Sequence, residues 1–288
     1  MYFQLPVTAT TIDTLLRDAA VRLSATAEQP RDEAEWLLSE LLALPRAALR
    51  HVDLPVPALL ARYAQWVQRR ADGEPFAYVT GTQPFRRLTL RVTPEVLIPR
   101  PDTEHLVEWA LSILKNQAVP VRVLDVCTGS GCVVLALADE APGHQYWASD
   151  CSPAALDVAR DNAARLRQAV QFMAADALQL PLATPRFHLI TANPPYIAAG
   201  DAHLPALHHE PVLALVSGAD GLELLRVLIA QAPQWLEPGG WLLLEHGHDQ
   251  AAAVRNLLQA QGFDEVATRR DFGGNERVSG GRWGVAHG

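Results

Sequence analysis

Strand-like and helix-like segments alternate from about residue 101 to the end of the chain, and this alternation limits the fold more than any other feature. Short β-branched runs such as 121–126 (VRVLDV) precede segments with helical apolar spacing such as 131–141 (GCVVLALADEA). Strands that alternate with helices predict a mainly parallel sheet covered by helices on both faces. We therefore expect an α/β fold with a seven-stranded sheet. The expected strands are 121–126, 145–150, 170–176, 187–193 and 239–247, with two more in 265–286.

The first 100 residues have a different pattern. Residues 10–72 carry apolar side chains at helical spacing and predict a small helical bundle, with Tyr63 and Trp66 in its core. Residues 85–100 (FRRLTLRVTPEVLIPR) alternate apolar and polar side chains, which is typical of a β-hairpin. The expected domains are a helical domain (1–84), a hairpin connector (85–100) and an α/β domain (101–288).

Composition argues against several classes of function. The net charge of −8, from 24 basic and 32 acidic residues, disfavours a broad phosphate-binding surface, so we expect no nucleic-acid partner. The three cysteines, Cys127, Cys132 and Cys151, form no C-x-x-C pair, so neither a disulfide framework nor a metal site is indicated. No apolar run approaches the ~18 residues of a membrane span. The N-terminus lacks the pattern of a secretory signal, so a cytoplasmic protein without a membrane partner is expected.

Two glycines, Gly129 and Gly131, follow the first strand of the α/β domain in VLDVCTGSGCVV. Glycine suits a backbone that turns tightly beside a ligand. Asp125 ends this strand and Asp150 ends the next, where an acid can bind a ribose diol. A dinucleotide site would need a third glycine where Val134 stands. The pattern instead resembles the S-adenosylmethionine site of class I methyltransferases, in which a carboxylate-bearing turn such as that of Asp125 suits the sulfonium and the amino-acid end.

The tetrapeptide NPPY follows the strand at 187–193. It resembles the [N/D]-P-P-[Y/F/W] motif of methyltransferases that act on planar nitrogens. The side-chain oxygen of Asn193 and the carbonyl of Pro194 can each accept one N–H of an amide or aryl-amine group, which aims its lone pair and favours the developing positive charge. Pro195 adds rigidity, and Tyr196 can stack on the flat group. The motif alone leaves adenine, cytosine and a glutamine amide open as targets.

The surrounding segments narrow this choice. Residues 74–108, DVCTGSGCVVLALA, NPPYI, LLLEHG and RDFGGNERVSGGRW together resemble the HemK-type family of release factor glutamine methyltransferases, and IPRPDTE (98–104) is the most specific part. The resemblance runs from about residue 70 to the end, and the helical N-terminus fits the family's small leading domain. It implies a class I (Rossmann-like) methyltransferase that uses S-adenosylmethionine to methylate the glutamine of the Gly-Gly-Gln loop in class 1 peptide chain release factors. The leading domain would help to dock that protein substrate.

The resemblance also implies roles for individual residues. Asn193 and Pro194 would be catalytic, and Asn193 to Tyr196 would hold the glutamine. Arg100 to Glu104 would shape the same pocket, whereas Glu210 and Pro211 receive no role. The residues expected at the cofactor are Asp125, Cys127, Thr128, Gly129, Ser130, Gly131, Asp150 at the ribose, Asp176 and Ala177 at the adenine, and Asn193.

Cys127 stands where the family usually has glycine. If this position requires φ > 0, a cysteine there is strained by roughly 1–2 kcal/mol. We favour a turn that tolerates a side chain, and we expect burial to keep the thiol from acting as a nucleophile. Three alternatives to the release-factor hypothesis remain: a glutamine methyltransferase for a large-subunit ribosomal protein, a nucleic-acid adenine amino-methyltransferase, and a non-catalytic cofactor-binding protein. The negative net charge counts against the second, and the intact NPPY motif counts against the third.

Overall fold

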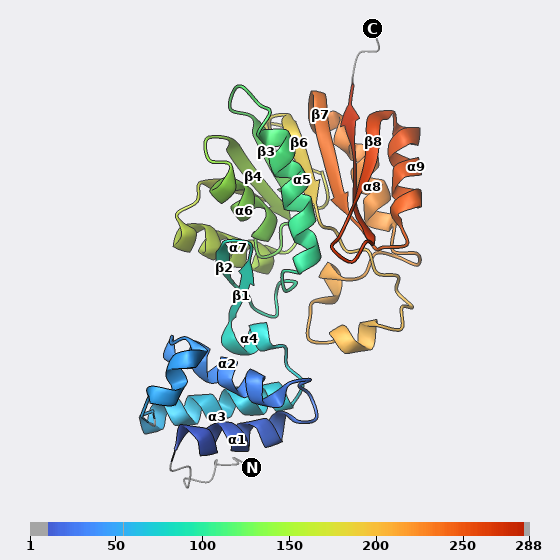
Figure 1. Ribbon diagram of the computed structural model, residues 1–288. Helices are drawn as coiled ribbons and strands as arrows, with labels where there is room; N and C mark the ends of the chain where they lie inside the picture. Colours follow the sequence, from blue (N-terminus) through green and yellow to red (C-terminus); the bar gives the residue numbers. More distant parts are fainter. Residues whose placement is uncertain (1–10, 54, 285–288) are drawn as a thin grey trace. The chain divides into compact units, whose positions relative to one another are not determined.

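The computed structural model describes residues 11–53 and 55–284, and the chain divides into two compact units (Figure 1). The first is Met1–Thr82 and the second is Gln83–Gly288. The residues of the expected hairpin connector, 85–100, all lie within the second unit. The boundaries at residues 84 and 100 remain predictions.

The first unit is a small helical bundle. Its first helix begins at a threonine cap, where the Thr11 side chain accepts a hydrogen bond from the backbone N–H of Thr14. Leu37 and Tyr63 are fully buried and Trp66 is nearly so, which confirms the expected aromatic core. The Tyr63 hydroxyl donates to the carbonyl of Ala34 at 2.9 Å, so its buried polar end is satisfied. The elements are α1 (Ile12–Leu23), α2 (Pro30–Leu42), the 3-10 turn η1 (Arg46–His51), α3 (Pro57–Ala71) and α4 (Phe76–Thr80).

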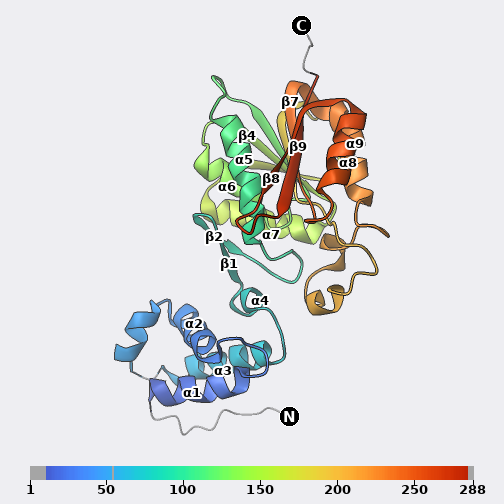
Figure 2. The ribbon, with the colours of Figure 1, turned by 45° about the vertical axis from the view of Figure 1, so that its right-hand side comes forward.

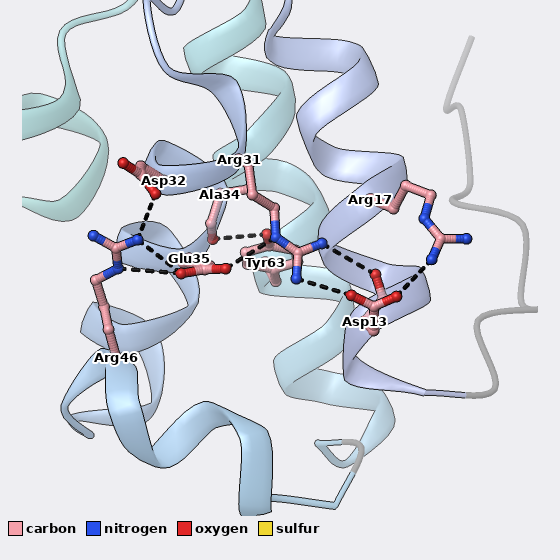
Figure 3. A network of polar contacts seen from close by, with 8 residues as sticks. All are labelled: Asp13, Arg17, Arg31, Asp32, Ala34, Glu35, Arg46 and Tyr63. Atoms are coloured by element: carbon pink, nitrogen blue, oxygen red, sulfur yellow. Dashed lines mark hydrogen bonds and ion pairs between the residues drawn. The ribbon is translucent and has the colours of Figure 1, made fainter.

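A network of ion pairs covers one side of this bundle (Figure 3). Arg31 bridges Asp13 of α1, at 3.0 Å, and Glu35 of α2, at 2.9 Å. Arg46 of η1 reaches Asp32 at 2.6 Å and Glu35 at 2.7 Å. Burial raises the pKa of Glu35, but hydrogen bonds from Arg46 and Arg31 outweigh it, so that pKa lies below its usual value. Partly exposed ion pairs contribute about 0–1 kcal/mol each to the stability of the fold. The bundle is therefore held together mainly by its apolar core, and the ion pairs constrain how its helices align.

The second unit is built on a seven-stranded sheet, as expected. The strand order is β5-β4-β3-β6-β7-β9-β8, with parallel pairing from β5 to β7 and antiparallel pairing of β9 with β7 and β8. The parallel strands are β3 (Arg122–Val126), β4 (Gln145–Asp150), β5 (Val170–Ala174), β6 (Phe187–Ala192) and β7 (Leu236–Glu245). The last two are β8 (Phe263–Arg270) and β9 (Glu276–Trp283).

Helices cover both faces of this sheet (Figure 2). One core joins α5 (Glu104–Leu114) and α6 (Cys132–Glu140) to the face that presents Val123, and Ala163 of α7 (Pro153–Leu166) belongs to it. The other joins α8 (Glu223–Trp235) and α9 (Ala251–Gln261) to the face that presents Leu124. Successive β3 residues therefore serve opposite cores, as the two-residue period of a strand requires.

A hairpin of β1 (Thr82–Phe85) and β2 (Leu88–Arg91) forms a separate two-stranded sheet, earlier in the chain than the range 85–100 predicted from alternation. The Asn162 side chain of α7 accepts from the backbone N–H of Arg91 at 2.7 Å and donates to its carbonyl at 2.9 Å. The end of the hairpin is thereby attached to the helix layer, which sets the course of residues 92–103 toward the sheet.

The sheet order changes direction between β3 and β6. In open α/β sheets, ligands bind outside the carboxyl ends of the strands at this position. The three short 3-10 turns η2 (Pro101–Thr103), η3 (Leu204–Leu207) and η4 (Val212–Ala214) belong to the loops of this unit. Across the described residues, no helix combines the length and apolar character that a bilayer crossing requires.

Candidate active site

A cavity of about 650 Å³ lies at the carboxyl ends of β3, β4 and β6. This volume is ordinary for a small-molecule site. Its wall contains many of the residues singled out from the sequence: Asp125, Cys127, Thr128, Gly129, Ser130, Asp150, Asp176, Asn193 and Pro195. Four other residues predicted from the sequence to belong to the site do not line the cavity: Gly131, Ala177, Pro194 and Tyr196.

The two glycines of the turn after β3 have different tasks. Gly129 has φ 53°, and a Cβ on it would meet no atom within 4 Å, so this backbone is open to a ligand. Gly131, with φ 83°, caps α6, and a Cβ there would come within 3.0 Å of Leu135. Gly131 therefore serves the packing of α6, and its place in the cofactor loop stays a prediction.

Cys127 adopts a left-handed conformation with φ 57°. The positive φ that the sequence left open is therefore present at this position. A non-glycine residue in this region is strained by about 1–2 kcal/mol. Burial, with the nearby Asp150 carboxylate adding to it, raises the pKa of the Cys127 thiol well above its usual value. The group is thus a protonated thiol, not a nucleophile.

Asp125 is buried at the end of β3 and holds the turn together. It accepts hydrogen bonds from the hydroxyls of Thr128, at 2.7 Å, and Thr191, at 2.8 Å. Burial raises its pKa to about 7, although both hydroxyls act in the opposite direction. Its carboxylate therefore joins β3, β6 and the glycine-rich turn, and its contact with a cofactor's amino-acid end stays a prediction.

Asp150 is fixed by two backbone donors. Its Oδ2 accepts from the N–H of Gly129 and its Oδ1 from the N–H of Ser152, both at 2.9 Å. Each carboxylate oxygen has a second lone-pair direction, so the side chain retains acceptors for a diol at the cavity wall. Asp176 lies further along the same wall and is exposed. Its neighbour Ala177, with φ 49°, is only 5% exposed and packs in the core, so its side chain does not reach the cavity.

Asn193 leaves the sheet just after Ala192, which pairs with Leu244 of β7. Its amide nitrogen donates to the hydroxyl of Thr103 at 3.1 Å. This contact uses the NH₂ end of the side chain and leaves Oδ1 to accept from another group. Asn193 lies on the cavity wall, so its acceptor is available where a ligand would lie.

The other residues of the NPPY motif lie less directly in the cavity. Pro195 lines it, whereas Pro194 is buried. The hydroxyl of Tyr196 donates to Oε1 of Glu245 at 3.4 Å, and its ring packs against the second core. The polar end of Tyr196 thus faces the interior, and stacking on a substrate remains a prediction.

The charge of the wall favours a cation over a phosphate. Acidic side chains predominate along it, and Arg100 is the one basic residue among the described lining residues. The guanidinium of Arg100 is itself paired with Glu210. A dinucleotide's pyrophosphate would meet no uncommitted cation, whereas a sulfonium would lie among carboxylates. The acidic members are Glu95, Asp125, Asp150, Asp176 and Glu223.

Comparison with known proteins identifies the family. Residues 14–81 match the family described as PrmC N-terminal domain, and residues 123–217 match the one described as Methyltransferase domain. A release factor glutamine methyltransferase from Coxiella burnetii is 42% identical over 271 residues, which cover 91% of this chain and 95% of that protein. One from Pseudomonas aeruginosa is 45% identical over 285 residues, which cover 95% and 99%. This chain belongs to the release factor glutamine methyltransferase family.

Solved structures agree on the fold of this family member. A methyltransferase from Pyrococcus furiosus has a TM-score of 0.51 at 18% identity and covers 68% of this chain and 89% of its own. A 16S rRNA N2 G1207 methyltransferase from T. thermophilus, in complex with AdoMet and guanosine, has a TM-score of 0.53 at 19% identity and covers 70% and 49%. These likenesses confirm the Rossmann-like methyltransferase fold.

The IPRPDTE segment supports the cavity through contacts that sequence reasoning did not assign. Glu210 is buried, accepts from the backbone N–H of Ile98 at 3.1 Å, and pairs with Arg100. Thr103 contacts Asn193, and Asp102 lies 3.3 Å from Arg277. The segment was recognised as characteristic, but its partners come from distant parts of the chain and carry no local signal.

Proposed function

We propose that this chain transfers a methyl group from S-adenosylmethionine to the side-chain amide nitrogen of the glutamine in the Gly-Gly-Gln loop of class 1 release factors. One observation carries the proposal: Asn193 of the NPPY motif and Asp150 line the same cavity. An acid that would bind a ribose diol and an acceptor that would bind an amide group thus face one cavity. The names of the relatives, at 42–46% identity, support the same substrate.

The residues of the wall fit the cofactor in shape and charge. When bound, S-adenosylmethionine supplies an electrophilic methyl group on a positively charged sulfur. Asp150, already oriented by two backbone N–H groups, would accept from the ribose hydroxyls. Gly129 has no side chain, so the cofactor could approach its backbone closely. The acidic side chains of the cavity wall suit the positive charge of the sulfonium.

The NPPY corner would orient the substrate amide. Oδ1 of Asn193 accepts one N–H and the carbonyl of Pro194 accepts the other, so the nitrogen lone pair is aimed at the methyl group. An amide nitrogen is a poor nucleophile, and two fixed acceptors stabilise the positive charge that develops on it. Positioning of this kind can contribute several kcal/mol to the barrier reduction.

A nucleic-acid base is a weaker candidate for the target. A flipped base would bring a phosphate backbone to the mouth of the cavity, and the cation in its wall is already paired with Glu210. We propose that the helical unit contributes to docking of the protein substrate, because a single glutamine side chain offers little binding energy. A release-factor substrate would also place the enzyme in the cytoplasm.

The test is to incubate the protein with methyl-labelled S-adenosylmethionine and, separately, a class 1 release factor, a release factor with its Gly-Gly-Gln glutamine replaced by alanine, large-subunit ribosomal proteins, and DNA. Mass spectrometry then locates the label. Label on the glutamine of the intact factor, and none on the alanine variant, is expected. Label confined to a ribosomal protein or to DNA would refute the proposal.

A further inference from the structure

A short apolar turn at the rim of the cavity has no role so far in the proposed reaction. It is η4, in the loop that joins β6 to α8 (Figure 1). Its residues Val212 and Leu213 line the cavity, yet they are 69% and 63% exposed. Val227 of α8 lines the same wall and is 36% exposed. Apolar side chains exposed at the rim of a cavity are typical of a surface that a partner covers. We call Val212 and Leu213 the apolar lip.

The chain just before the apolar lip is fixed to the IPRPDTE segment. Glu210 is only 6% exposed, and its carboxylate accepts from the backbone N–H of Ile98 at 3.1 Å and pairs with the guanidinium of Arg100. Pro211 follows with φ −66°, a value that its ring imposes. The chain therefore enters the turn from an anchored residue and with little backbone freedom.

The chain just after the apolar lip is fixed to the residues that follow the NPPY motif. Ile197 donates its N–H to the carbonyl of Leu215 and accepts from the N–H of Ser217, both at 2.9 Å. The N–H of Ala199 donates to the carbonyl of Gly218 at the same distance. The lip is thus held at both ends, by the IPRPDTE segment before it and by the chain leaving the NPPY corner after it.

The position and the chemistry of the apolar lip favour the substrate over the cofactor. Asp150 and Gly129, which suit the cofactor, belong to the ends of β4 and β3, whereas the lip is bonded to the chain that continues from Asn193. Valine and leucine side chains form no hydrogen bonds, so they suit methylene groups and the faces of peptide units. A Gly-Gly pair carries no side chains, so its backbone can approach two branched side chains closely.

We propose that the apolar lip binds the protein substrate, by packing against the glycine backbone and the methylene groups of the glutamine in the Gly-Gly-Gln segment. The proposal rests on the proposed function, because that segment is the occupant. Glu210 is then a positioning residue, which touches no substrate and holds the lip through Ile98 and Arg100. The lip contributes to binding and not to the methyl-transfer step, so its loss raises the KM for the release factor.

The experiment compares the wild type with a serine variant that combines Val212→Ser and Leu213→Ser. Both positions are exposed, so the fold should tolerate the changes. The KM for a class 1 release factor should rise by roughly 10- to 100-fold, while kcat changes less than about threefold and the Kd for S-adenosylmethionine less than about twofold.

Two further variants serve as controls. A variant that combines Val212→Ile and Leu213→Met keeps the lip apolar and should keep the KM within about threefold of wild type. Val119→Ser should leave the KM unchanged. Val119 is 65% exposed and precedes β3, so it lies at the edge of the sheet opposite the cavity.

The role of Glu210 is tested by Glu210→Gln in two backgrounds. The amide cannot form the ion pair with Arg100, so the KM for the release factor should rise in the wild-type background. In the serine variant the same change should add less than about twofold, because the contact that it supports is already lost. A further rise as large as that in the wild-type background would overturn the positioning role of Glu210.

The outcomes separate this inference from the proposed function. A KM for the release factor within about twofold of wild type in the serine variant would overturn the inference alone. Weaker binding of S-adenosylmethionine with an unchanged KM for the release factor would assign the lip to the cofactor, and would also overturn it. Absence of wild-type activity on the release factor would overturn both proposals.

Discussion

The backbone N–H of Gly129 donates a 2.9 Å hydrogen bond to Oδ2 of Asp150, and so joins the turn after β3 to the end of β4. A second donor, the N–H of Ser152, holds the other oxygen at the same distance. The carboxylate is thus in place before any ligand arrives. Preorganisation of this kind improves affinity because less side-chain freedom is lost on binding.

Asp150→Asn should weaken S-adenosylmethionine binding by roughly 10- to 100-fold, since hydrogen bonds to a charged group contribute about 1.5–3 kcal/mol. The amide also carries one acceptor oxygen for two backbone donors, so the turn loses a contact. Calorimetric titration with the cofactor measures the effect. Asp157→Asn, on the exposed side of α7, is the matched control. Equal affinity in the wild type and the Asp150 variant would exclude Asp150 from the cofactor site.

Asn193→Ala should lower kcat by roughly 100- to 1,000-fold, as removal of a single oxyanion-type hydrogen-bond group does elsewhere. Cofactor affinity should be retained, because Asp150 and the glycine-rich turn are untouched. Steady-state kinetics on a release factor and a binding titration provide the two readouts. Asn116→Ala, at an exposed position after α5, controls for loss of an asparagine. A parallel loss of binding and turnover would mean that Asn193 is structural.

The main features of the fold could be predicted from sequence because they depend on local periodicity. The strand at 145–150 has the predicted bounds, and the one predicted at 187–193 ends one residue earlier, at Ala192. A hairpin was also predicted, but the packing of Leu88 and Leu90 in the same core as α5 and α6 was not. That packing is a tertiary contact, which alternation along the chain does not encode.

The candidate site could be predicted in part, because some of its residues stand at the ends of strands that local periodicity reveals. Asp150 and Asn193 stand at strand ends, and strand ends of a parallel sheet converge, so their common cavity follows from the sequence pattern. The environment of Asp125 could not be predicted, since Thr191 comes from a different strand. The contacts of Thr103 with Asn193 and of Glu245 with Tyr196 also join distant segments.

Cys127→Gly should be more stable than Cys127→Ala by about 1 kcal/mol. Alanine keeps the Cβ that is strained at φ 57°, whereas glycine removes it and gives back part of the gain through its freer unfolded chain. Chemical denaturation of the two variants measures the difference. At Cys132, the first residue of α6, the alanine variant should instead be more stable than the glycine variant, because glycine weakens a helix. If alanine is the more stable residue at both positions, the turn is not strained.

Asp125→Asn should change how stability depends on pH. Burial raises the pKa of Asp125 to about 7 in the folded protein, above its ordinary value of 3.8, so the folded state binds more protons between these values. Its contribution to stability is therefore greatest at low pH and is lost as the pH rises toward and through 7. The variant lacks this dependence, so its unfolding free energy relative to wild type should rise from pH 5 to pH 8. Groups common to both proteins, including Glu245 with its own raised pKa, largely cancel in this difference. Denaturant unfolding at the two pH values tests it, and a constant gap would show that Asp125 titrates alike in the folded and unfolded chain.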